Sequence, residues 1–377
     1  MIQLKSNTNP LKIAIIGSRG YPYVYSGYET LIKELSERLV GRGCEVTVYC
    51  HRNLFKEKPA LLNGIKLVYV PTIETKSLSQ LIHSFLSMSH AVVSDVDVIF
   101  AVNAANGPFG LISKIFRKPT AINVDGLEWL RPKWKGLGAI YFKTAARLST
   151  ILYDQIINDS EEMRKVYLNI FKKESVVIAY GAEVKKSEDP SLIQQWPIGS
   201  KEYYLVVGRM IPDNNADIIV KGFLASNSTK KMVVVGDVFY KDAYADALKA
   251  LKDDRLIFTG YVYDPEVLAA LYHHCYVYVH GHEFGGTNPT MIKAMAYGCA
   301  ILALNTVFNK EMLNNDLYGI YFEKNQEAVR QQINYADQYP KKIKKLRQNS
   351  YQGITDKYNW DCITDKYLEI FRLLAEK

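Results

Sequence analysis

Residues 12–40 read KIAIIGSRGYPYVYSGYETLIKELSERLV and contain a complete strand–loop–helix unit. The continuous apolar run at 12–17 ends in glycine, which predicts a buried strand. Between residues 27 and 40, large apolar side chains recur near helical spacing at Leu31, Ile32, Leu35 and Leu39. That spacing predicts an amphipathic helix. A strand joined to a helix by a Gly-rich loop indicates an α/β fold.

The same pattern continues along the chain in two series. Short β-branched runs predict further strands at 45–50, 66–70, 96–102, 119–125, 154–160 and 174–180, then at 203–208, 231–236, 255–260, 275–281 and 299–304. Helical patterns between them imply parallel sheets with helices on both faces. The polar segment 184–201 separates the two series. We therefore expect two doubly wound domains, 1–183 and 184–354, and a final helix at about 355–377.

Composition limits the class of protein. The 377 residues are 48% hydrophobic and 23% charged, which is typical of globular domains. The sequence shows no apolar run of the length that a membrane span needs, and its N-terminus lacks the apolar core of a signal peptide. Five cysteines without a CxxC pair predict neither a disulfide framework nor a zinc site. We expect a cytoplasmic protein.

The net charge of +8 is unevenly distributed. Residues 1–183 contain 23 Lys and Arg against 16 Asp and Glu. This excess favours an anionic partner for the first half, such as a lipid surface or a phosphorylated acceptor. An ordinary solvated surface is the alternative. Nucleic acid is not expected, because no zinc motif, aromatic RNA-binding string or Arg-rich run is present.

The loop at 17–30, GSRGYPYVYSGYET, does not follow the dinucleotide fingerprint GxGxxG. Gly27 stands where the helix begins, so a ligand can approach the backbone and its N–H groups favour an anion. Arg19 adds a fixed cation. An ordinary Gly-rich βα loop is the alternative.

The stretch NVDGLEWLRPKWK (123–135) follows a predicted strand. It places Asp125 at the strand's carboxyl end, where this carboxylate can orient a hydroxyl or take part in proton transfer. Alternatively, Asp125 caps a helix and the two tryptophans pack internally. A basic and aromatic contact to a membrane or a sugar is a third reading.

Two later loops offer groups for phosphate and sugar. In VGRMIPDNN (207–215), Arg209 follows Gly208 at a strand end, and arginine recognises phosphate oxygens through its planar fork. Taken alone, an exposed surface arginine is the commoner explanation. In HGHEFGGTNPTMIKAMAYG (280–298), N–H groups are exposed at Gly285 and Gly286 just before a predicted helix. Either Thr287 or Asn288 can cap that helix. The two histidines in this stretch lack a third clustered ligand, so we expect no metal.

These four motifs, in this order, resemble the GT-B glycosyltransferases of family 4, most closely the bacterial rhamnosyltransferase branch of capsule and O-antigen synthesis. The resemblance covers nearly the whole chain. It implies two Rossmann-like doubly wound domains that face an interdomain cleft. It also implies retaining transfer from a nucleotide-diphosphate sugar, without a metal or other cofactor. The C-terminal domain would hold the nucleotide and the N-terminal domain the acceptor.

The resemblance also assigns roles to individual residues. Arg209 would neutralise the leaving pyrophosphate, and Asp125 stands where many family members have a histidine beside the reacting sugar. These two are the expected catalytic residues. The expected donor-binding residues are Arg19, Gly27, Gly208, Arg209, His282, Gly285, Gly286, Thr287, Asn288 and Lys293.

The sequence departs from the family pattern at three positions. The wider family has two glutamates eight residues apart where this chain has Gly285 and Lys293, and it has a lysine where this chain has Asn214. Lys293 cannot accept a hydrogen bond from a ribose hydroxyl.

We expect a hexosyltransferase, with dTDP-rhamnose as a candidate donor and a lipid-linked saccharide as acceptor. It would work in the cytoplasm, peripherally on the inner face of an anionic membrane. Lys293 motivates one alternative, a catalytically weak subunit that binds a nucleotide sugar. A GT-B sugar-nucleotide epimerase is another alternative.

Overall fold

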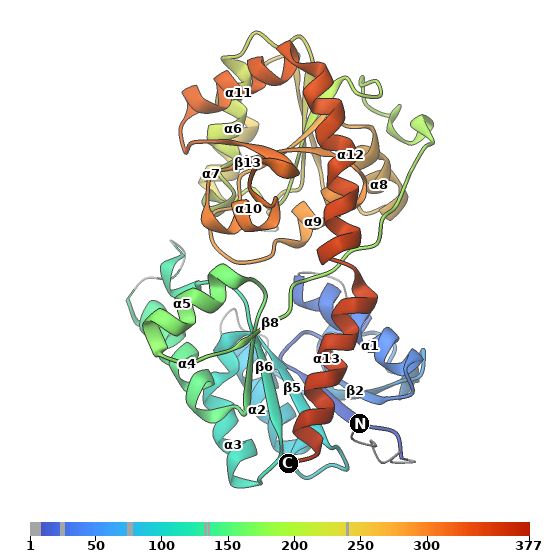
Figure 1. Ribbon diagram of the computed structural model, residues 1–377, viewed down its shortest axis with the longest axis vertical. Coiled ribbons are helices and arrows are strands. Elements are labelled where there is room, and N and C mark those ends of the chain that lie inside the picture. Colours follow the sequence, from blue (N-terminus) through green and yellow to red (C-terminus); the bar gives the residue numbers. More distant parts are fainter. Residues whose placement is uncertain (1–8, 23–26, 74–77, 132–133, 135, 239–240) are drawn as a thin grey trace, which may run out of the picture. The chain divides into compact units, whose positions relative to one another are not determined.

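The computed structural model describes residues 9–22, 27–73, 78–131, 134, 136–238 and 241–377. Two compact units make up the chain (Figure 1). Residues 1–130, 134–179 and 360–377 belong to the N-terminal unit, and residues 131–133 and 180–359 belong to the C-terminal unit. Each unit is built on a single, largely parallel β-sheet.

The N-terminal sheet has eight strands in the order β3-β4-β2-β1-β5-β6-β7-β8. Its strands are β1 (Lys12–Ile16), β2 (Glu45–His51), β3 (Leu61–Leu62), β4 (Ile65–Val70), β5 (Val98–Val102), β6 (Thr120–Val124), β7 (Gln155–Asn158) and β8 (Val176–Val177). The pairings are parallel except for the short β3–β4 hairpin. Its central strands β5 and β6 are buried along their whole length, as expected for strands covered on both faces.

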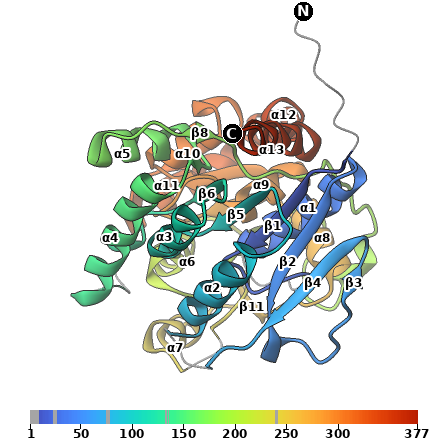
Figure 2. The same cartoon turned by 90° about the horizontal axis from the view of Figure 1, so that it is seen from below.

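Helices cover both faces of this sheet (Figure 2). They are α1 (Gly27–Gly41), α2 (Leu78–Ala91), α3 (Gly110–Ile115), α4 (Leu137–Leu152), α5 (Glu161–Phe171) and α13 (Trp360–Ala375). The helices α2, α3 and α4 lie on one face, while α1 and α13 lie on the other (Figure 2). Phe100 on β5 packs against Tyr367 and Phe371 of α13, with ring centroids 5.3 and 5.4 Å away.

The C-terminal sheet has six strands in the order β11-β10-β9-β12-β13-β14. Its strands are β9 (Tyr203–Val207), β10 (Lys231–Val235), β11 (Leu256–Gly260), β12 (Val277–His280), β13 (Ala300–Leu304) and β14 (Gly319–Phe322). The helices are α6 (Ala216–Leu224), α7 (Ala243–Lys249), α8 (Pro265–His274), α9 (Pro289–Ala296), α10 (Val307–Met312), α11 (Gln326–Gln338) and α12 (Pro340–Lys357). The strands pair in parallel throughout, so the expected fold of two Rossmann-like domains is confirmed.

The final helix begins at Trp360 rather than near residue 355, because the chain is interrupted after α12. The backbone N–H of Ala182 donates to the carbonyl of Tyr358 at 2.8 Å, and Ala182 also forms a β-bridge with Asn359. This extended pairing is incompatible with a continuous helix through 358–359. None of the helices in the described part of the chain combines the length and the apolarity that a membrane crossing needs.

Candidate functional site

The loops that follow β9 and β12 lie side by side at the point where the C-terminal sheet reverses its strand order. From β9 the chain moves outward through β10 and β11, and then returns to β12 on the other side of β9. Open α/β sheets bind ligands beyond the carboxyl ends of the strands at such a switch point. The predicted residues Gly208, Arg209 and His282 are all in these two loops.

Asn214 connects the two loops through its side-chain amide. Its Nδ2 donates to the carbonyl oxygen of Arg209 at 2.8 Å, and its Oδ1 lies 3.0 Å from Nδ1 of His282. Next to it, Nδ2 of Asn215 donates to the carbonyl of Gly281 at 2.9 Å. The backbone N–H of Glu283 donates to the carbonyl of Asp213 at 3.1 Å. Four contacts therefore fix the geometry of the β9 and β12 loops within the C-terminal unit.

This arrangement determines which nitrogen of His282 carries the proton. A carbonyl only accepts, so the amide nitrogen of Asn214 faces Arg209 and its oxygen faces His282. The ring must then donate from Nδ1. Burial first, and then the Arg131 and Arg209 cations, lower the pKa of His282 to about 3, although a hydrogen bond to the Phe284 backbone acts in the opposite direction. A neutral ring protonated on Nδ1 presents Nε2 as a hydrogen-bond acceptor.

Arg209 is an exposed cation at the edge of this network. Among the described residues, no carboxylate lies within salt-bridge distance of its guanidinium. Its position depends on close backbone packing, because a Cβ on Gly236 would lie 2.1 Å from the carbonyl oxygen of Gly208. A Cβ on Gly208 would lie 3.2 Å from Nδ2 of Asn214. The guanidinium is thus available to an anion next to the carboxyl end of β9.

The β12 loop then leads into helix α9. Gly285 has a φ of 125°, a conformation that side chains disfavour. Asn288, not Thr287, is the N-cap, and its Oδ1 accepts from the backbone N–H of Thr290 at 3.0 Å. Pro289 occupies the first helical turn as expected. Gly286 and the buried Thr287 complete the turn, so the predicted residues 285–288 form one loop at the start of α9.

Lys293 lies farther along α9, and its side chain extends toward Tyr272 on α8. Its Nζ lies over the ring of Tyr272 on α8, 5.8 Å from the centroid. Burial, with a smaller contribution from the Lys185 cation, lowers the pKa of Lys293. Within the described residues, no hydrogen bond or ion pair connects Lys293 with Arg209, Asn214 or His282.

The Glu283 carboxylate contacts Lys324 and Asn215, and it makes no contact with Arg209 or His282 among the described residues. Its carboxylate pairs with Nζ of Lys324 at 2.6 Å and contacts Nδ2 of Asn215 at 3.5 Å. It therefore holds the β12 loop in place beside β14.

In the N-terminal unit, the predicted residues Arg19 and Gly27 flank the β1–α1 loop. The backbone N–H of Arg19 donates to Oε1 of Glu29 at 3.0 Å, and Glu29 is buried in the first turn of α1. Gly27 is the first residue of α1. Residues 23–26 of this loop lie outside the described residues.

Asp125 follows β6 directly, as its place in the sequence predicts. The hydroxyl of Tyr28, one residue into α1, donates to Oδ1 of Asp125, and the Asp125 N–H donates to the same hydroxyl at 3.4 Å. Burial first, and then the Asp125 carboxylate, raise the pKa of Tyr28. Tyr28 therefore remains a protonated donor that orients Asp125.

Two tryptophans after Asp125 serve packing. Trp129 lies edge-on to Tyr167 and Phe171, with ring centroids 6.3 and 6.0 Å away. Nε1 of Trp134 donates to Oε2 of Glu128 at 2.9 Å. Residues 132–133 and 135 of this motif lie outside the described residues.

Sequence reasoning missed the connecting roles of Asn214 and Tyr28. In the sequence, Asn214 is notable only because the family pattern has a lysine there. Tyr28 is notable only as part of the loop motif at 17–30. An amide that follows a strand-end arginine at a switch point is a usable signal for such a connection. No sequence signal pairs Tyr28 with Asp125, because 96 residues separate them. In the described part of the chain, no three His, Cys, Asp or Glu side chains are grouped to hold a metal ion.

Two family models match successive parts of the chain. Residues 189–353 match the glycosyl transferases group 1, and residues 11–183 match a domain of unknown function, DUF1972. No curated protein matches the chain in sequence.

Solved structures of similar fold cover nearly the entire chain. Sucrose-phosphate synthase from Thermosynechococcus elongatus is 16% identical with a TM-score of 0.81, over 97% of this chain and 99% of that one. The Anabaena protein HepE, solved with UDP, is 16% identical with a TM-score of 0.75, over 96% and 100%. The catalytic domain of starch synthase IV from Arabidopsis thaliana is 10% identical with a TM-score of 0.76, over 98% and 100%. At these identities the likeness shows a common fold.

Proposed function

We propose that this glycosyltransferase, whose residues 189–353 match the glycosyl transferases group 1, moves a hexosyl group from a nucleotide-diphosphate sugar to a lipid-linked saccharide. The transfer would retain the configuration at the anomeric carbon. The proposed donor is dTDP-rhamnose, and the proposed setting is surface-polysaccharide synthesis, such as capsule or O-antigen, at the cytoplasmic face of a membrane.

The observation that carries this proposal is the pairing of a cation with a neutral acceptor at the switch point. The Arg209 guanidinium can neutralise the negative charge that develops on a departing diphosphate. Nε2 of His282 can accept a hydrogen bond from a sugar hydroxyl, because its low pKa of about 3 keeps the ring neutral. Asn214 joins the backbone carbonyl of Arg209 to the His282 ring, so the backbone that carries the arginine is held beside the acceptor before the donor binds.

The turn at the start of α9 supports a second contact to the donor. Gly285 is only partly buried and allows a ligand to approach the backbone, whereas Gly286, expected to be exposed, is buried. The N-terminal end of a helix also favours negative charge. We assign Thr287 and Asn288 to the wall of this subsite. The lower pKa of Lys293 and its contact with Tyr272 support only an indirect role for Lys293, beneath the subsite.

The N-terminal unit is proposed to hold the acceptor. Asp125 would orient the attacking hydroxyl, with its carboxylate positioned by Tyr28. Gly27 and Arg19 border the same sheet edge after β1 and would approach the donor phosphate. Both assignments rest on these residues following the carboxyl ends of β6 and β1.

Solved structures of the same fold support a nucleotide donor. HepE has been solved with UDP-glucose, and the starch synthase domain with ADP. We extend nucleotide-diphosphate binding to this chain on the basis of the switch-point residues described above.

The test is a transfer assay with the full chain, a lipid-linked saccharide and a panel of dTDP-, UDP- and GDP-sugars. We expect one donor to give a glycosylated lipid with a retained anomeric configuration, seen by mass spectrometry and NMR, also in the presence of EDTA. Arg209→Ala should abolish most of the transfer. Inversion of configuration would refute the retaining mechanism.

Two outcomes would favour the alternatives. If nucleoside diphosphates raise the melting temperature but no donor is used, the chain is a binding subunit. If a sugar nucleotide is converted without any acceptor, the chain is an epimerase.

A further inference from the structure

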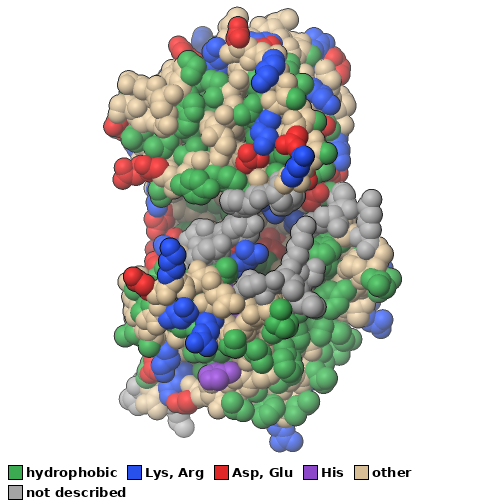
Figure 3. All heavy atoms as spheres, turned by 180° about the vertical axis from the view of Figure 1, so that it is seen from behind, with side chains coloured by type: hydrophobic (Ala, Val, Ile, Leu, Met, Phe, Trp, Pro, Cys, Tyr) green, Lys and Arg blue, Asp and Glu red, His purple; other side chains and the backbone are tan. Residues whose placement is uncertain are grey.

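One face of the N-terminal unit exposes an unusual number of large apolar side chains. We call it the α2–α4 face and define it by exposed residues on and next to α2, α3 and α4. Its apolar members are Phe85, Val93, Leu111, Ile115, Phe116, Leu137, Ile140 and Ile151, with exposed fractions from 48 to 85%. Figure 3 shows hydrophobic side chains gathered on this side of the unit.

The exposed apolar side chains of α4 lie along one side of the helix. On α4, Leu137, Ile140, Arg147 and Ile151 recur at intervals of three, seven and four residues, which places them along one side of the helix. The opposite side of α4 is buried at Ala145, Ala146 and Ser149. A surface helix usually has polar side chains on its outer side. In α4, apolar side chains also cover the outer side.

The three helices form a continuous surface. The Nζ of Lys114 on α3 donates to the carbonyl of Ile151 at the end of α4, at 2.8 Å. The ring of Phe85 on α2 lies 6.2 Å from that of Phe109, which directly precedes α3. The apolar side chains thus extend across α2, α3 and α4 without an intervening element.

The charged side chains on the three helices of this face have one sign. The sequences of α2, α3 and α4 contain no Asp or Glu, and their cations are Lys114, Lys143 and Arg147. All three cations are exposed. Between residues 98 and 153 the only acidic residues are Asp125 and Glu128. The positive charge of the N-terminal half is therefore concentrated where the apolar side chains are.

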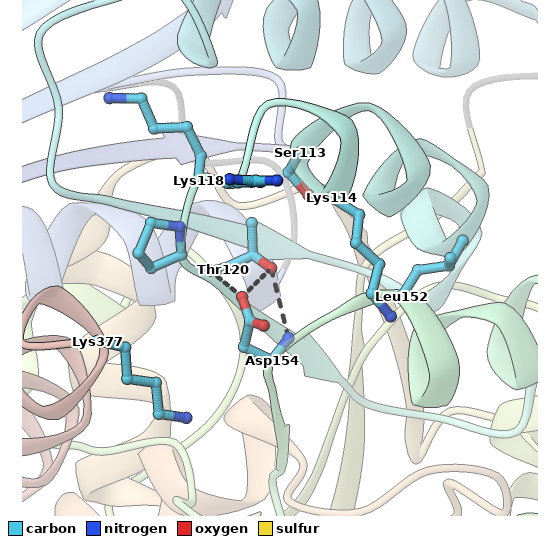
Figure 4. A pocket seen from close by; sticks show the side chains of 9 residues that line it. Ser113, Lys114, Lys118, Thr120, Leu152, Asp154 and Lys377 are labelled. Atoms are coloured by element: carbon cyan, nitrogen blue, oxygen red, sulfur yellow. Dashed lines mark hydrogen bonds between the residues drawn. The ribbon is translucent and has the colours of Figure 1, made fainter.

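A cavity of about 260 Å³ at the end of α3 adds to this positive margin (Figure 4). Lys114, Arg117, Lys118 and Lys377 line it. The only acidic lining residue, Asp154, accepts hydrogen bonds from the backbone N–H and hydroxyl of Thr120 at 2.8 and 3.1 Å. The cavity lies at the amino ends of β6 and β7, which is the opposite end of β6 from Asp125.

We propose that the α2–α4 face docks the protein on an anionic lipid bilayer. Apolar side chains would enter the boundary between headgroups and acyl chains, while the cations would remain at the level of the lipid phosphates. A face with both properties, on three helices without an acidic residue, complements such a bilayer better than it does water. The inference rests on the proposed lipid-linked acceptor, because α4 begins at Leu137, shortly after the Asp125 loop.

The test measures binding of the full chain to vesicles of phosphatidylcholine alone or mixed with phosphatidylglycerol. We expect binding to the mixed vesicles that weakens as salt is raised. The double variants Ile115→Glu/Ile140→Glu and Lys143→Glu/Arg147→Glu should each lower the partition coefficient about tenfold or more.

Matched controls replace two exposed apolar or two exposed cationic side chains by glutamate outside the face. They are Val307→Glu/Leu373→Glu, at positions 56 and 57% exposed, and Lys341→Glu/Lys345→Glu on α12. Both should bind within about twofold of the natural chain. All variants should keep the melting-temperature rise with nucleoside diphosphates, since this readout depends on the C-terminal unit.

Vesicle binding requires no sugar donor, so its result is independent of whether transfer is found. No binding at low salt, or equal loss in the face and control variants, would refute the docking surface. Dimers in sedimentation that only the face variants dissociate, without vesicle binding, would identify the face as a contact between copies of the chain.

Discussion

Nδ1 of His282 lies 3.0 Å from Oδ1 of Asn214, and the same amide donates to the carbonyl oxygen of Arg209. The chain has an asparagine at this position, where the family that its sequence resembles is expected to have a lysine. A lysine would add a positive charge at this position. Asn214 instead hydrogen-bonds to the Arg209 carbonyl and to the His282 ring, and so sets the tautomer of His282. We therefore expect Asn214 to organise this site through hydrogen bonds rather than through charge.

Asn214→Asp should make activity sensitive to pH. A carboxylate beside His282 favours its charged form and raises the pKa of the ring from about 3. As pH falls, Nε2 would become a donor and lose its role as acceptor. Because one nearby opposite charge shifts a pKa by about 1–3 units, we expect kcat/KM of the variant to fall as the pH is lowered from 7 to 5, while that of the natural chain shows no such titration of His282. Asn349→Asp on α12 is the control, and a flat profile in both variants would contradict the tautomer assignment.

Arg209→Ala should reduce kcat by about a hundredfold or more, because it removes the cation proposed to face the leaving diphosphate. Arg209 is exposed and unpaired with any described carboxylate, so the melting temperature should change little. Arg209→Lys should recover part of the activity. Arg330→Ala, on α11, serves as the comparison, and an equal loss of activity there would remove the special role of Arg209.

Lys293→Glu should not increase turnover. The nitrogen of Lys293 lies over Tyr272, 5.8 Å from the ring centroid, and a carboxylate at this place would lose the cation–π contact. We expect a lower melting temperature and unchanged or weaker nucleotide affinity. Lys293→Met, which keeps the apolar stem, should have nearly natural nucleotide affinity by calorimetry. A large gain in kcat for the glutamate variant would instead show that the chain is a decayed enzyme.

The strands were predictable because buried parallel strands read as continuous apolar runs. β1, β9 and β10 each end just before the glycine that terminates the run. β14 was not predicted, because its four residues Gly319–Phe322 follow a polar, Asn-rich turn and are too short for a periodic signal. The break at 358–359 was also missed, since it depends on pairing with Ala182, far away in sequence.

The candidate site was predictable to the level of loops and not of contacts. Arg209 and residues 285–288 follow strand ends, and this position is visible in the sequence. The direction of Lys293 was not, because both sides of α9 are packed and only the surrounding helices decide which way its ammonium points. The connection between Asn214 and His282 depends likewise on two loops that the sheet order brings together.

Tyr28→Phe should impair transfer through Asp125. The variant keeps the ring but removes the hydroxyl that donates to the Asp125 carboxylate, and a half-buried acceptor without its donor costs about 1–2 kcal/mol. We expect a roughly tenfold lower kcat and a small fall in stability. If Asp125→Asn is inactive and Tyr28→Phe behaves like the natural chain, Tyr28 does not position the carboxylate.

Two buried histidines of the N-terminal unit add a pH dependence of stability. The rings of His51 and His83 are stacked with centroids 3.9 Å apart, and His83 is fully buried. Burial first, and then the proximity of His51, lower the pKa of His83 to about 3. Its ordinary value is about 6.5. Between these two values the unfolded chain binds a proton that the folded chain does not.

His83→Phe should therefore flatten the acid side of the stability curve. For the natural chain, the contribution of His83 to the free energy of unfolding is fully present above pH 6.5 and decreases as pH falls toward 3. The loss between pH 7 and pH 5 is about 2 kcal/mol from this residue alone. Urea unfolding at both pH values should show this difference between the natural chain and the variant. Equal slopes for the natural chain and His83→Phe would mean that the buried ring takes up its proton near the ordinary pKa.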